Sequence, residues 1–597
     1  MKFLDELARR NVIRVGLAYL VASWLIVQVA ETVLPAFGFG PEIVRTIVIL
    51  LFIGFLLTLV VAWTFELTPG GLKLERDVDR SQSITRSTGK RLDRIVIVVL
   101  GIALSFFALD KFVFEPMRYA ERIEDARQQG RSETMAESRK DASIAVLPFA
   151  DLSPDQDHQY FSDGLAEEIL NLLAKIDGLR VTSRTSSFSF AGKAVDVPGI
   201  ASALNVAYVL EGSVRRSEDR LRVTAQLIDT VSDSHLWSHT YDRKMSDIFR
   251  MQDEIAASVI ESLKITMAGE VQLSVPTDPA AYSLFLQARH LWRQGSEEGV
   301  ARAYSLLRQA LDIDSQYAPA WEALSTVYTY QAGLGQIPVD EGYRKAREAS
   351  RRALEIDPHN AQALASLAWD AMSSRKDFPA AAAYFDSARQ SEPNNPMVLG
   401  NIATFAAVVG RLGVAVDLLN QAIEYDPIDS TKYTNLGAFY FALGRLDEAD
   451  VALMKALELG PDDVWAQQAI MYLRILQKRP DEALQVAENF EHASFRHLAL
   501  PMIFHDLGRA EDADAALIAL KDSLGNGVSR YELAEVYAHL NRMDEAFESL
   551  QLAVRSGDDL SFIRTSAFLR SLSKDSRWED ILLQVGLADE QVSSLKL

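Results

Sequence analysis

The sequence of 597 residues contains no cysteine. This absence excludes disulfide bonds, thiolate metal sites and cysteine nucleophiles, although it does not identify a redox compartment. The chain also lacks an excess of basic residues, because 61 Lys and Arg stand against 82 Asp and Glu and give a formal net charge of −21. We therefore expect no non-specific binding of nucleic acid, and we interpret the acidic bias as a solvated surface.

Patterns that carry catalysis are also missing. A phosphate-binding loop needs glycines followed by Lys and Ser or Thr, and the stretches FGFGPE and AGKAVD lack that arrangement. His235 and His239 fall in a predicted strand, where about 13 Å would separate them, too far for one metal ion. No histidine and carboxylate relay can be assigned to Ser183, Ser186 and Ser187. We therefore expect no enzyme activity, no cofactor and no metal.

Long apolar runs occur only near the N-terminus, at residues 15–37, 43–63 and 95–114. Each is close to the roughly 20 residues that cross a bilayer as a helix. The first run is too long for a cleavable signal peptide and is not followed by a cleavage pattern. The sequence therefore predicts a membrane anchor over residues 1–114, with three transmembrane helices in contact with the lipid bilayer.

Basic residues beside these runs indicate the orientation of the anchor. They cluster before the first run and between the second and third runs, and the short loop between the first two runs has none. The positive-inside rule then places the N-terminus in the cytoplasm and the chain after residue 114 in the bacterial periplasm, as a multi-pass inner-membrane protein. Arg45, on the far side, would have to extend its side chain to the interface.

Two segments separate the anchor from the C-terminal half. Residues 115–141 are highly charged and predict a helical stalk. Residues 142–266 then show short apolar strands and amphipathic helices in the order βαβαβββα, ending in a three-stranded meander at residues 208–215, 220–229 and 235–241. This order predicts a small α+β domain with one sheet covered by helices.

Three stretches of this domain carry a family resemblance: SIAVLPFADLSPDQDHQYFSDGLAEEIL, VTSRTSSFSFAGK and LNVAYVLEGSVRRSEDRLRVTAQLIDTVSDSHLWSHTYDR. They resemble the TolB-like amino-terminal domain, which is related to the flagellar FlgO domain. The resemblance implies that helical repeats follow. Relatives of this kind are fused to a class III adenylate cyclase domain or a winged-helix DNA-binding domain, whereas here membrane spans occupy that place.

A period of 34 residues runs through most of the C-terminal half, because Pro393, Pro427 and Pro461 are spaced by that interval. The turn between the two helices of a unit repeats at Gly444 and at the equivalent glycine 34 residues before it. This pattern resembles the tetratricopeptide (TPR) repeat, a pair of antiparallel helices. The residues that we expect to pack each unit are Trp321, Leu324, Tyr328, Ala353, Pro358, Pro393, Pro427, Tyr433, Leu436, Gly437, Tyr440, Gly444, Ala449, Ala456 and Pro461.

The resemblance implies an all-α TPR solenoid of about eight repeats over residues 280–587, ending in a polar-faced helix that caps the last repeat. Repeats of this kind stack into a superhelix whose concave face holds a peptide or protein. The predicted fold is therefore multidomain: three transmembrane helices, a small α+β domain and a TPR solenoid.

The functional hypothesis is a non-catalytic scaffold or adaptor, anchored in the membrane, that binds protein or peptide partners in the periplasm. An alternative is a membrane signalling sensor, in which the TolB-like domain binds a small ligand and signals through the transmembrane helices. The residues that contact a partner cannot be assigned from the sequence.

Overall fold

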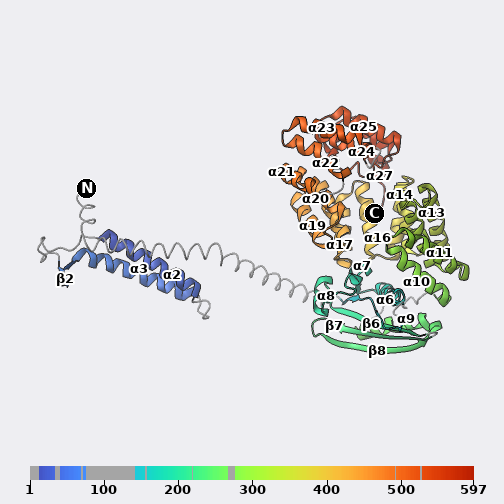
Figure 1. The fold of residues 1–597 in the computed structure, drawn as a ribbon, viewed down its shortest axis with the longest axis horizontal. Coiled ribbons are helices and arrows are strands. Elements are labelled where there is room, and N and C mark those ends of the chain that lie inside the picture. Colours follow the sequence, from blue (N-terminus) through green and yellow to red (C-terminus); the bar gives the residue numbers. More distant parts are fainter. Residues whose placement is uncertain are drawn as a thin grey trace. The chain divides into compact units, whose positions relative to one another are not determined.

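The computed structural model describes residues 12–33, 41–68, 71–74, 142–154, 158–217, 220–265, 276–490, 493–524 and 528–596. The chain divides into two compact units, residues 1–132 and residues 133–597 (Figure 1). Each is described by itself.

The described residues of the first unit form two helices, α2 (Val12–Val33) and α3 (Pro41–Thr64), followed by a hairpin of β1 (Phe65–Thr68) and β2 (Gly71–Leu74). The hydroxyl of Tyr19 on α2 donates a hydrogen bond to the carbonyl oxygen of Leu51 on α3, at 3.0 Å. A Cβ atom at Gly54 would lie 2.2 Å from that hydroxyl oxygen. The glycine therefore allows the two helices to approach closely.

The prediction of three membrane spans is not supported. Among the described residues, one helical segment, Thr46–Thr64, is long and apolar enough to cross a membrane. The run at residues 15–37 overlaps α2 up to Val33, and the structure describes the side chains of that helix only in part. The third run, at residues 95–114, and the stalk at residues 115–141 lie outside the described residues.

The second unit begins with a six-stranded mixed sheet. Its strands are β3 (Ala142–Val146), β4 (Ala150–Asp151), β5 (Leu179–Val181), β6 (Tyr208–Ser217), β7 (Arg220–Asp229) and β8 (Ser234–Lys244), in the spatial order β5-β3-β6-β7-β8, with β4 paired to β6. Strands β3, β5 and β6 are parallel, whereas β6, β7 and β8 form an antiparallel meander. The predicted order of a small domain with one sheet is confirmed, and the meander is longer than the sequence indicated.

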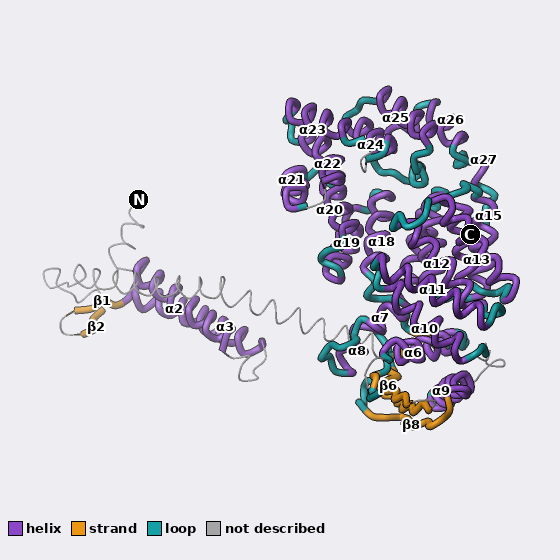
Figure 2. Tube along the Cα trace, turned by 45° about the vertical axis from the view of Figure 1, so that its right-hand side comes forward, coloured by secondary structure: helices purple, strands orange, loops and turns teal. Residues whose placement is uncertain are grey.

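Helices cover this sheet on both faces. On one face lie α6 (Gln159–Ala174) and α9 (Ile248–Ser262), which follows the short 3-10 helix η4 (Met245–Asp247), and Figure 2 shows α6 between the sheet and α10. On the other face, α8 (Val197–Leu204) packs Ile200 and Leu204 against Ala145 and Val209. A helix that the sequence did not predict, α7 (Arg184–Phe188), begins at Ser183, whose side chain accepts a hydrogen bond from the backbone N–H of Ser186.

The repeat array follows. Its helices are α10 (Pro279–Arg293), α11 (Glu297–Ile313), α12 (Ala318–Gly333), α13 (Val339–Ile356), α14 (Ala361–Ser373), α15 (Phe378–Ser391), α16 (Pro396–Val408), α17 (Leu412–Tyr425), α18 (Ser430–Leu443), α19 (Leu446–Leu459), α20 (Val464–Leu476), α21 (Pro480–Asn489), α22 (Ala493–Asp506), α23 (Ala510–Asp522), α24 (Arg530–His539) and α25 (Met543–Ser556). Each odd-numbered helix packs against the helix before it, so the described part of the array contains eight antiparallel pairs that curve in an arc (Figure 1).

The repeated prolines mark the junction between successive pairs. In three junctions, the residue two places after the proline caps the next helix: Asn395 follows Pro393, Asp429 follows Pro427 and Asp463 follows Pro461. Each cap side chain accepts hydrogen bonds from backbone N–H groups of the first turn, which would otherwise be unpaired. The proline ends one helix, and the acidic or amide residue begins the next.

The turn inside each pair needs a left-handed backbone. The residues with positive φ at this turn are Gly295 (67°), Gly335 (71°), Lys376 (53°), Gly410 (85°), Gly444 (81°), Lys478 (59°), Gly508 (72°) and Asn541 (59°). Within the pair of α18 and α19, a Cβ atom on Gly437 would lie 2.5 Å from the side chain of Leu453. The glycines of the 34-residue pattern thus have two causes: the left-handed turn inside a pair and the close approach of its two helices.

The chain after α25 does more than cap the last pair. The closing segment, residues 560–596, contains η5 (Leu569–Lys574), α26 (Arg577–Gln584) and α27 (Asp589–Val592). Arg411, at the start of α17, donates to the carbonyl oxygens of Val592 and Ser593, both at 3.1 Å. The ring of Phe568 lies 5.4 Å from that of Tyr472 on α20. The closing segment therefore packs against the array from the turn before α15, where Lys376 donates to Ser561 at 3.3 Å, to α24, where Ser566 donates to Glu535.

Candidate protein-binding groove

The part of the arc that the closing segment leaves open is a groove on α12, α14 and α16, the first helices of three successive pairs. It holds a cavity of about 230 Å³, with α13 contributing to one wall. Three aromatic residues line it, Tyr330 on α12, Tyr343 on α13 and Trp369 on α14, and two of them are well exposed: Tyr330 at 44 % and Trp369 at 38 %. Large aromatic side chains that stay open to solvent in a concave surface are a feature of binding sites.

Polar groups at the base of the groove are already paired within the protein. Arg347 forms an ion pair with the buried Asp370 at 2.8 Å, and the hydroxyl of Ser350 donates to that of Ser325 at 2.8 Å. The hydroxyl of Thr329 donates to a backbone carbonyl one turn before it. These contacts fix the helices and leave no unpaired charge in the cavity.

Other polar groups of the groove have no such partner. Within the described part of the chain, the side chains of Gln362, Asn401, Tyr330 and Trp369 make no hydrogen bond to protein. Each can donate a hydrogen bond, through an amide N–H, a phenol or an indole N–H. The groove thus presents donors and aromatic rings that are free to contact a ligand.

The α/β domain is joined to both ends of this groove. At the first end, Glu167 on α6 accepts from Arg293 on α10 at 2.7 Å and from Arg184 at 2.9 Å, and the buried Arg289 also contacts Glu168 at 2.8 Å. Burial alone would raise the pKa of Glu167, but the guanidinium groups outweigh it and lower this pKa to about 2. The carboxylate is therefore ionised at neutral pH.

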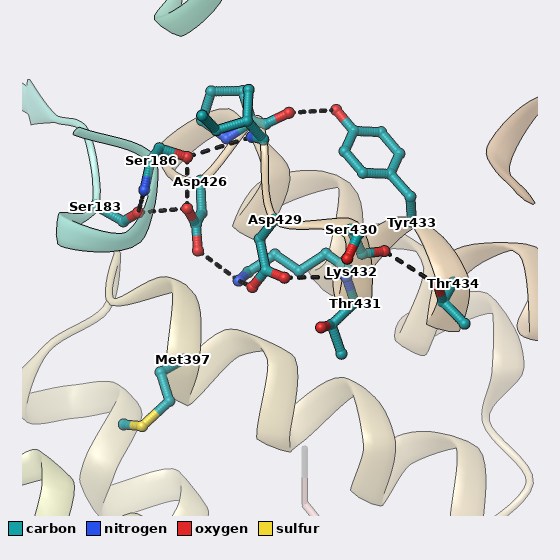
Figure 3. Close-up of polar contacts among 12 residues, drawn as sticks. Ser183, Ser186, Met397, Asp426, Asp429, Ser430, Thr431, Lys432, Tyr433 and Thr434 are labelled. Carbon is teal, nitrogen blue, oxygen red and sulfur yellow. Dashed lines mark hydrogen bonds and ion pairs between the residues drawn. The ribbon is translucent and has the colours of Figure 1, made fainter. Parts of the chain in front are cut away.

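At the second end, the turn between α17 and α18 meets the start of α7 (Figure 3). Asp426, which is 2 % exposed, accepts from the hydroxyls of Ser183 and Ser186, the latter at 2.6 Å. Its other carboxylate oxygen lies 2.6 Å from the ammonium nitrogen of Lys432. We call this set the serine–aspartate contact. It links residues about 240 positions apart, so it fixes how far the array curves between α10 and α18.

The packing residues expected from the sequence differ in how deeply they are buried. Leu324, Ala353, Leu436, Gly437, Ala449 and Ala456 are buried, whereas Trp321, Tyr328, Tyr433, Tyr440 and Pro427 are partly exposed. Pro358, Pro393, Gly444 and Pro461 are exposed at the turns. None of these residues lines the groove cavity.

The groove residues were missed because the repeat pattern marks packing positions only. One feature of the sequence could have identified the groove: Tyr330 and Trp369 are aromatic residues that lie between the packing positions, each in the first helix of its pair. Ser183 and Ser186, which we considered as nucleophiles, donate to Asp426, which in turn pairs with Lys432; among the described residues, neither serine contacts a histidine relay. His235 and His239 both lie on β8.

Comparisons with protein families agree with the repeat assignment. Tetratricopeptide repeat models match residues 433–463 and 502–561, so the C-terminal region contains TPR repeats, which mediate protein interactions. A model of the second domain of HilA/YgeH-like transcriptional regulators matches residues 140–258, the stretch in which the sequence resembled the TolB-like domain.

Two curated proteins match parts of the chain. "Putative adenylate cyclase 3" of Rhizobium meliloti (strain 1021) is 40% identical over 189 residues, which are 31% of this chain and 32% of that protein. "Small glutamine-rich tetratricopeptide repeat-containing protein 2" of Mycosarcoma maydis is 27% identical over 177 residues, 28% of this chain and 50% of that protein. The chain therefore spans between a third and a half of the curated relatives that it matches.

Solved structures with a partial likeness include Pseudomonas aeruginosa PilF and the pilus biogenesis factor PilW. PilF is 22% identical with a TM-score of 0.31, and the match covers 38% of this chain and 98% of PilF. PilW is 19% identical with a TM-score of 0.28, and the match covers 44% of this chain and 99% of PilW.

One expectation from the sequence is corrected by these comparisons. We expected no enzyme activity, and the match to a protein named as a putative adenylate cyclase contradicts that expectation. The expectation rested on motifs read along the sequence, and such motifs do not reveal a site assembled from residues that are distant in the chain.

Proposed function

We propose that the groove on α12, α14 and α16 binds an extended segment of a partner protein, so that the chain acts as a scaffold or adaptor. The observation that carries this proposal is the presence of exposed aromatic rings, Tyr330 and Trp369, beside donors that make no hydrogen bond within the described chain. Stacked helical repeats commonly use their concave surface in this way.

The rest of the array supports the same location. The closing segment already packs against the array from the turn before α15 to α24. The two joints with the α/β domain, at Glu167 and at Asp426, hold the groove helices at a fixed curvature. A preformed groove loses little entropy when it binds, and this favours affinity.

A selection of peptides tests the proposal. The full chain, immobilised in detergent micelles, is used to select binders from a random peptide library displayed on phage. We expect enriched peptides to bind the natural protein and to lose about tenfold in affinity for Trp369→Ala, since a buried aromatic contact carries a large share of such affinity.

Trp465→Ala is the matched control, because Trp465 is exposed on α20 and does not line the groove cavity. Its affinity for the selected peptides should equal that of the natural protein. Enrichment no greater than on empty micelles, or equal binding by Trp369→Ala, would contradict the proposal.

We also propose a division of the chain and a location. The proposed parts are a membrane anchor within residues 1–114, a stalk at 115–141, a TolB-like domain at 142–266 and the TPR array at 280–587, with the last two in the bacterial periplasm. The apolar helical segment Thr46–Thr64 and the basic residues before residue 15 support this arrangement. Reporter fusions after Leu597, one active only in the cytoplasm and one only in the periplasm, test it: a cytoplasmic signal would overturn the periplasmic placement.

A further inference from the structure

The chemistry of the groove narrows the class of partner, and this inference rests on the proposed function. We propose that the groove takes a proline-rich segment in the polyproline II conformation, a left-handed helix with three residues per turn and no internal hydrogen bonds. Three properties of the described groove carry this proposal: its charge, its hydrogen-bonding groups and the spacing of its helices.

The charge of the groove favours a neutral partner. Arg347 and Asp370 are the charged residues that line the cavity, and they pair with each other at 2.8 Å. Asp370 also accepts from Arg375 at 3.0 Å. A strongly acidic or basic segment, or a terminal carboxylate, would find no unpaired opposite charge among the lining residues and would lose its hydration on entry.

The hydrogen-bonding groups favour a segment that mainly accepts. The indole of Trp369 can only donate, and the amides of Gln362 and Asn401 and the phenol of Tyr330 can each donate as well. A proline offers a carbonyl oxygen but no N–H group. In polyproline II these carbonyls are not used internally, and they point outward where such donors can reach them.

The spacing of the helices agrees with the period of the ligand. Tyr330 and Trp369 lie on the first helices of successive repeats, α12 and α14, and Asn401 lies on the next such helix, α16. Packed helices are roughly 8 to 10 Å apart. One turn of polyproline II rises roughly 9 Å, so the same face of the ligand returns at each helix. Flat proline rings then stack on Tyr330 and Trp369, and Asn401 donates to a carbonyl oxygen of the ligand at the third helix.

Fluorescence anisotropy with labelled peptides tests this inference on the full chain in detergent. The probes are a proline peptide of about ten residues, a glycine–serine peptide of the same length, and acidic and basic peptides of that length. We expect the proline peptide to bind at least about tenfold more tightly than the others. Trp369→Ala should lower its affinity about tenfold, and Asn401→Ala by several fold.

Two further variants distinguish the loss of a ligand contact from a loss of folding. Trp369→Phe keeps a ring and loses the N–H group, so it should retain part of the affinity, whereas Trp465→Ala should retain all of it. Equal binding of the proline and glycine–serine peptides, or proline binding that is unchanged in both Trp369 variants, would overturn the inference. If library peptides that are charged or free of proline bind through Trp369 while the proline peptide does not, the inference fails and the proposed function stands.

Discussion

At the scale of single residues, the repeat pattern specifies backbone geometry more strictly than it specifies side chains. The turn inside a pair adopts positive φ at Gly410, Gly444 and Gly508, where glycine has no steric cost. At Lys376 and Lys478 the same conformation is imposed on a residue with a Cβ atom. Asn541, in the turn between α24 and α25, adopts it as well, so the described array contains three such turns at which a residue with a Cβ atom stands in place of glycine and lowers local stability.

Replacing one of these lysines tests this interpretation. We expect Lys478→Gly to raise the free energy of unfolding by about 0.5 to 1 kcal/mol, because relief of the left-handed strain exceeds the extra freedom of glycine in the unfolded chain. The lost ion pair with Asp506 contributes little, because its two charged groups are 3.6 Å apart and the Lys478 side chain is exposed to solvent. Urea unfolding measures the change. Gly444→Ala is the reciprocal variant and should lower stability, and a gain in both would contradict the strain argument.

At the scale of elements, a buried ionic joint fastens α6 to α10. Glu167 forms ion pairs with three guanidinium groups, those of Arg184, Arg289 and Arg293, and Arg289 is nearly as buried as Glu167. A buried charge that loses its partner is costly, because its desolvation is no longer offset. The joint should therefore stabilise the fold only when Glu167 and its arginine partners are all present.

We expect Glu167→Gln to destabilise the second unit by about 3 kcal/mol, the lower end for a broken buried pair because Arg289 keeps Glu168. The measurement is the urea midpoint of the full chain, followed by the fluorescence of tryptophans in the array. Glu348→Gln, which breaks an exposed pair with Arg344, should leave the midpoint unchanged. A midpoint for Glu167→Gln equal to that of this control would contradict the role of the joint.

A second element-scale contact joins α24 to the closing segment and depends on pH. Glu535 accepts from Ser566 at 2.6 Å and from Tyr531 at 3.2 Å, and burial raises its pKa to about 7. Because the pKa is raised in the folded state, the folded chain binds more protons than the unfolded chain above pH 4.5. The stabilisation is complete below that pH and is lost as pH rises through 7.

Thermal unfolding between pH 5 and 8 tests this linkage. The melting temperature of the natural protein should fall relative to that of Glu535→Gln as pH rises, because the amide does not titrate. Burial also raises the pKa of Glu322 to about 7, but this residue is present in both proteins, so its titration cancels in the comparison. The exposed Glu548→Gln should follow the natural protein. Parallel curves for the natural protein and Glu535→Gln would exclude the proposed titration.

Local elements were largely predictable from the sequence, and contacts between distant elements were not. The helix at residues 197–204 and the meander of β6, β7 and β8 follow from patterns of a few residues. Helix α7 was missed because it has five residues and no apolar period. The serine–aspartate contact joins residues about 240 positions apart, and its geometry depends on the summed curvature of several repeats, which no local pattern records.

At the scale of the whole molecule, contacts made by the α/β domain and by the closing segment make the second unit more closed than a free solenoid. The α/β domain joins the array at α10 and at the turn before α18, and the closing segment reaches back to α18, to α17 and to the turn before α15. The sequence predicted only a cap on the last repeat. The difference has a physical cause: the residues of η5 and α26 are amphipathic, and the curved array offers them an apolar interior to bury.

This closure leaves the groove on α12, α14 and α16 as the concave surface that we propose for a partner. Since TPR repeats mediate protein interactions, the position of the open surface decides where a partner can be held. The central claim is therefore that the partner binds in this groove and not elsewhere on the array.

The most direct measurement is photo-cross-linking of a selected peptide to the full chain. A benzophenone amino acid replaces Ser366, in the groove, or Val451, which is exposed on α19 and outside the cavity. The account predicts a covalent peptide adduct from position 366, abolished by excess unlabelled peptide, and none from position 451. An adduct from 451 alone, or equal adducts from both positions, would contradict the claim that the groove binds the partner.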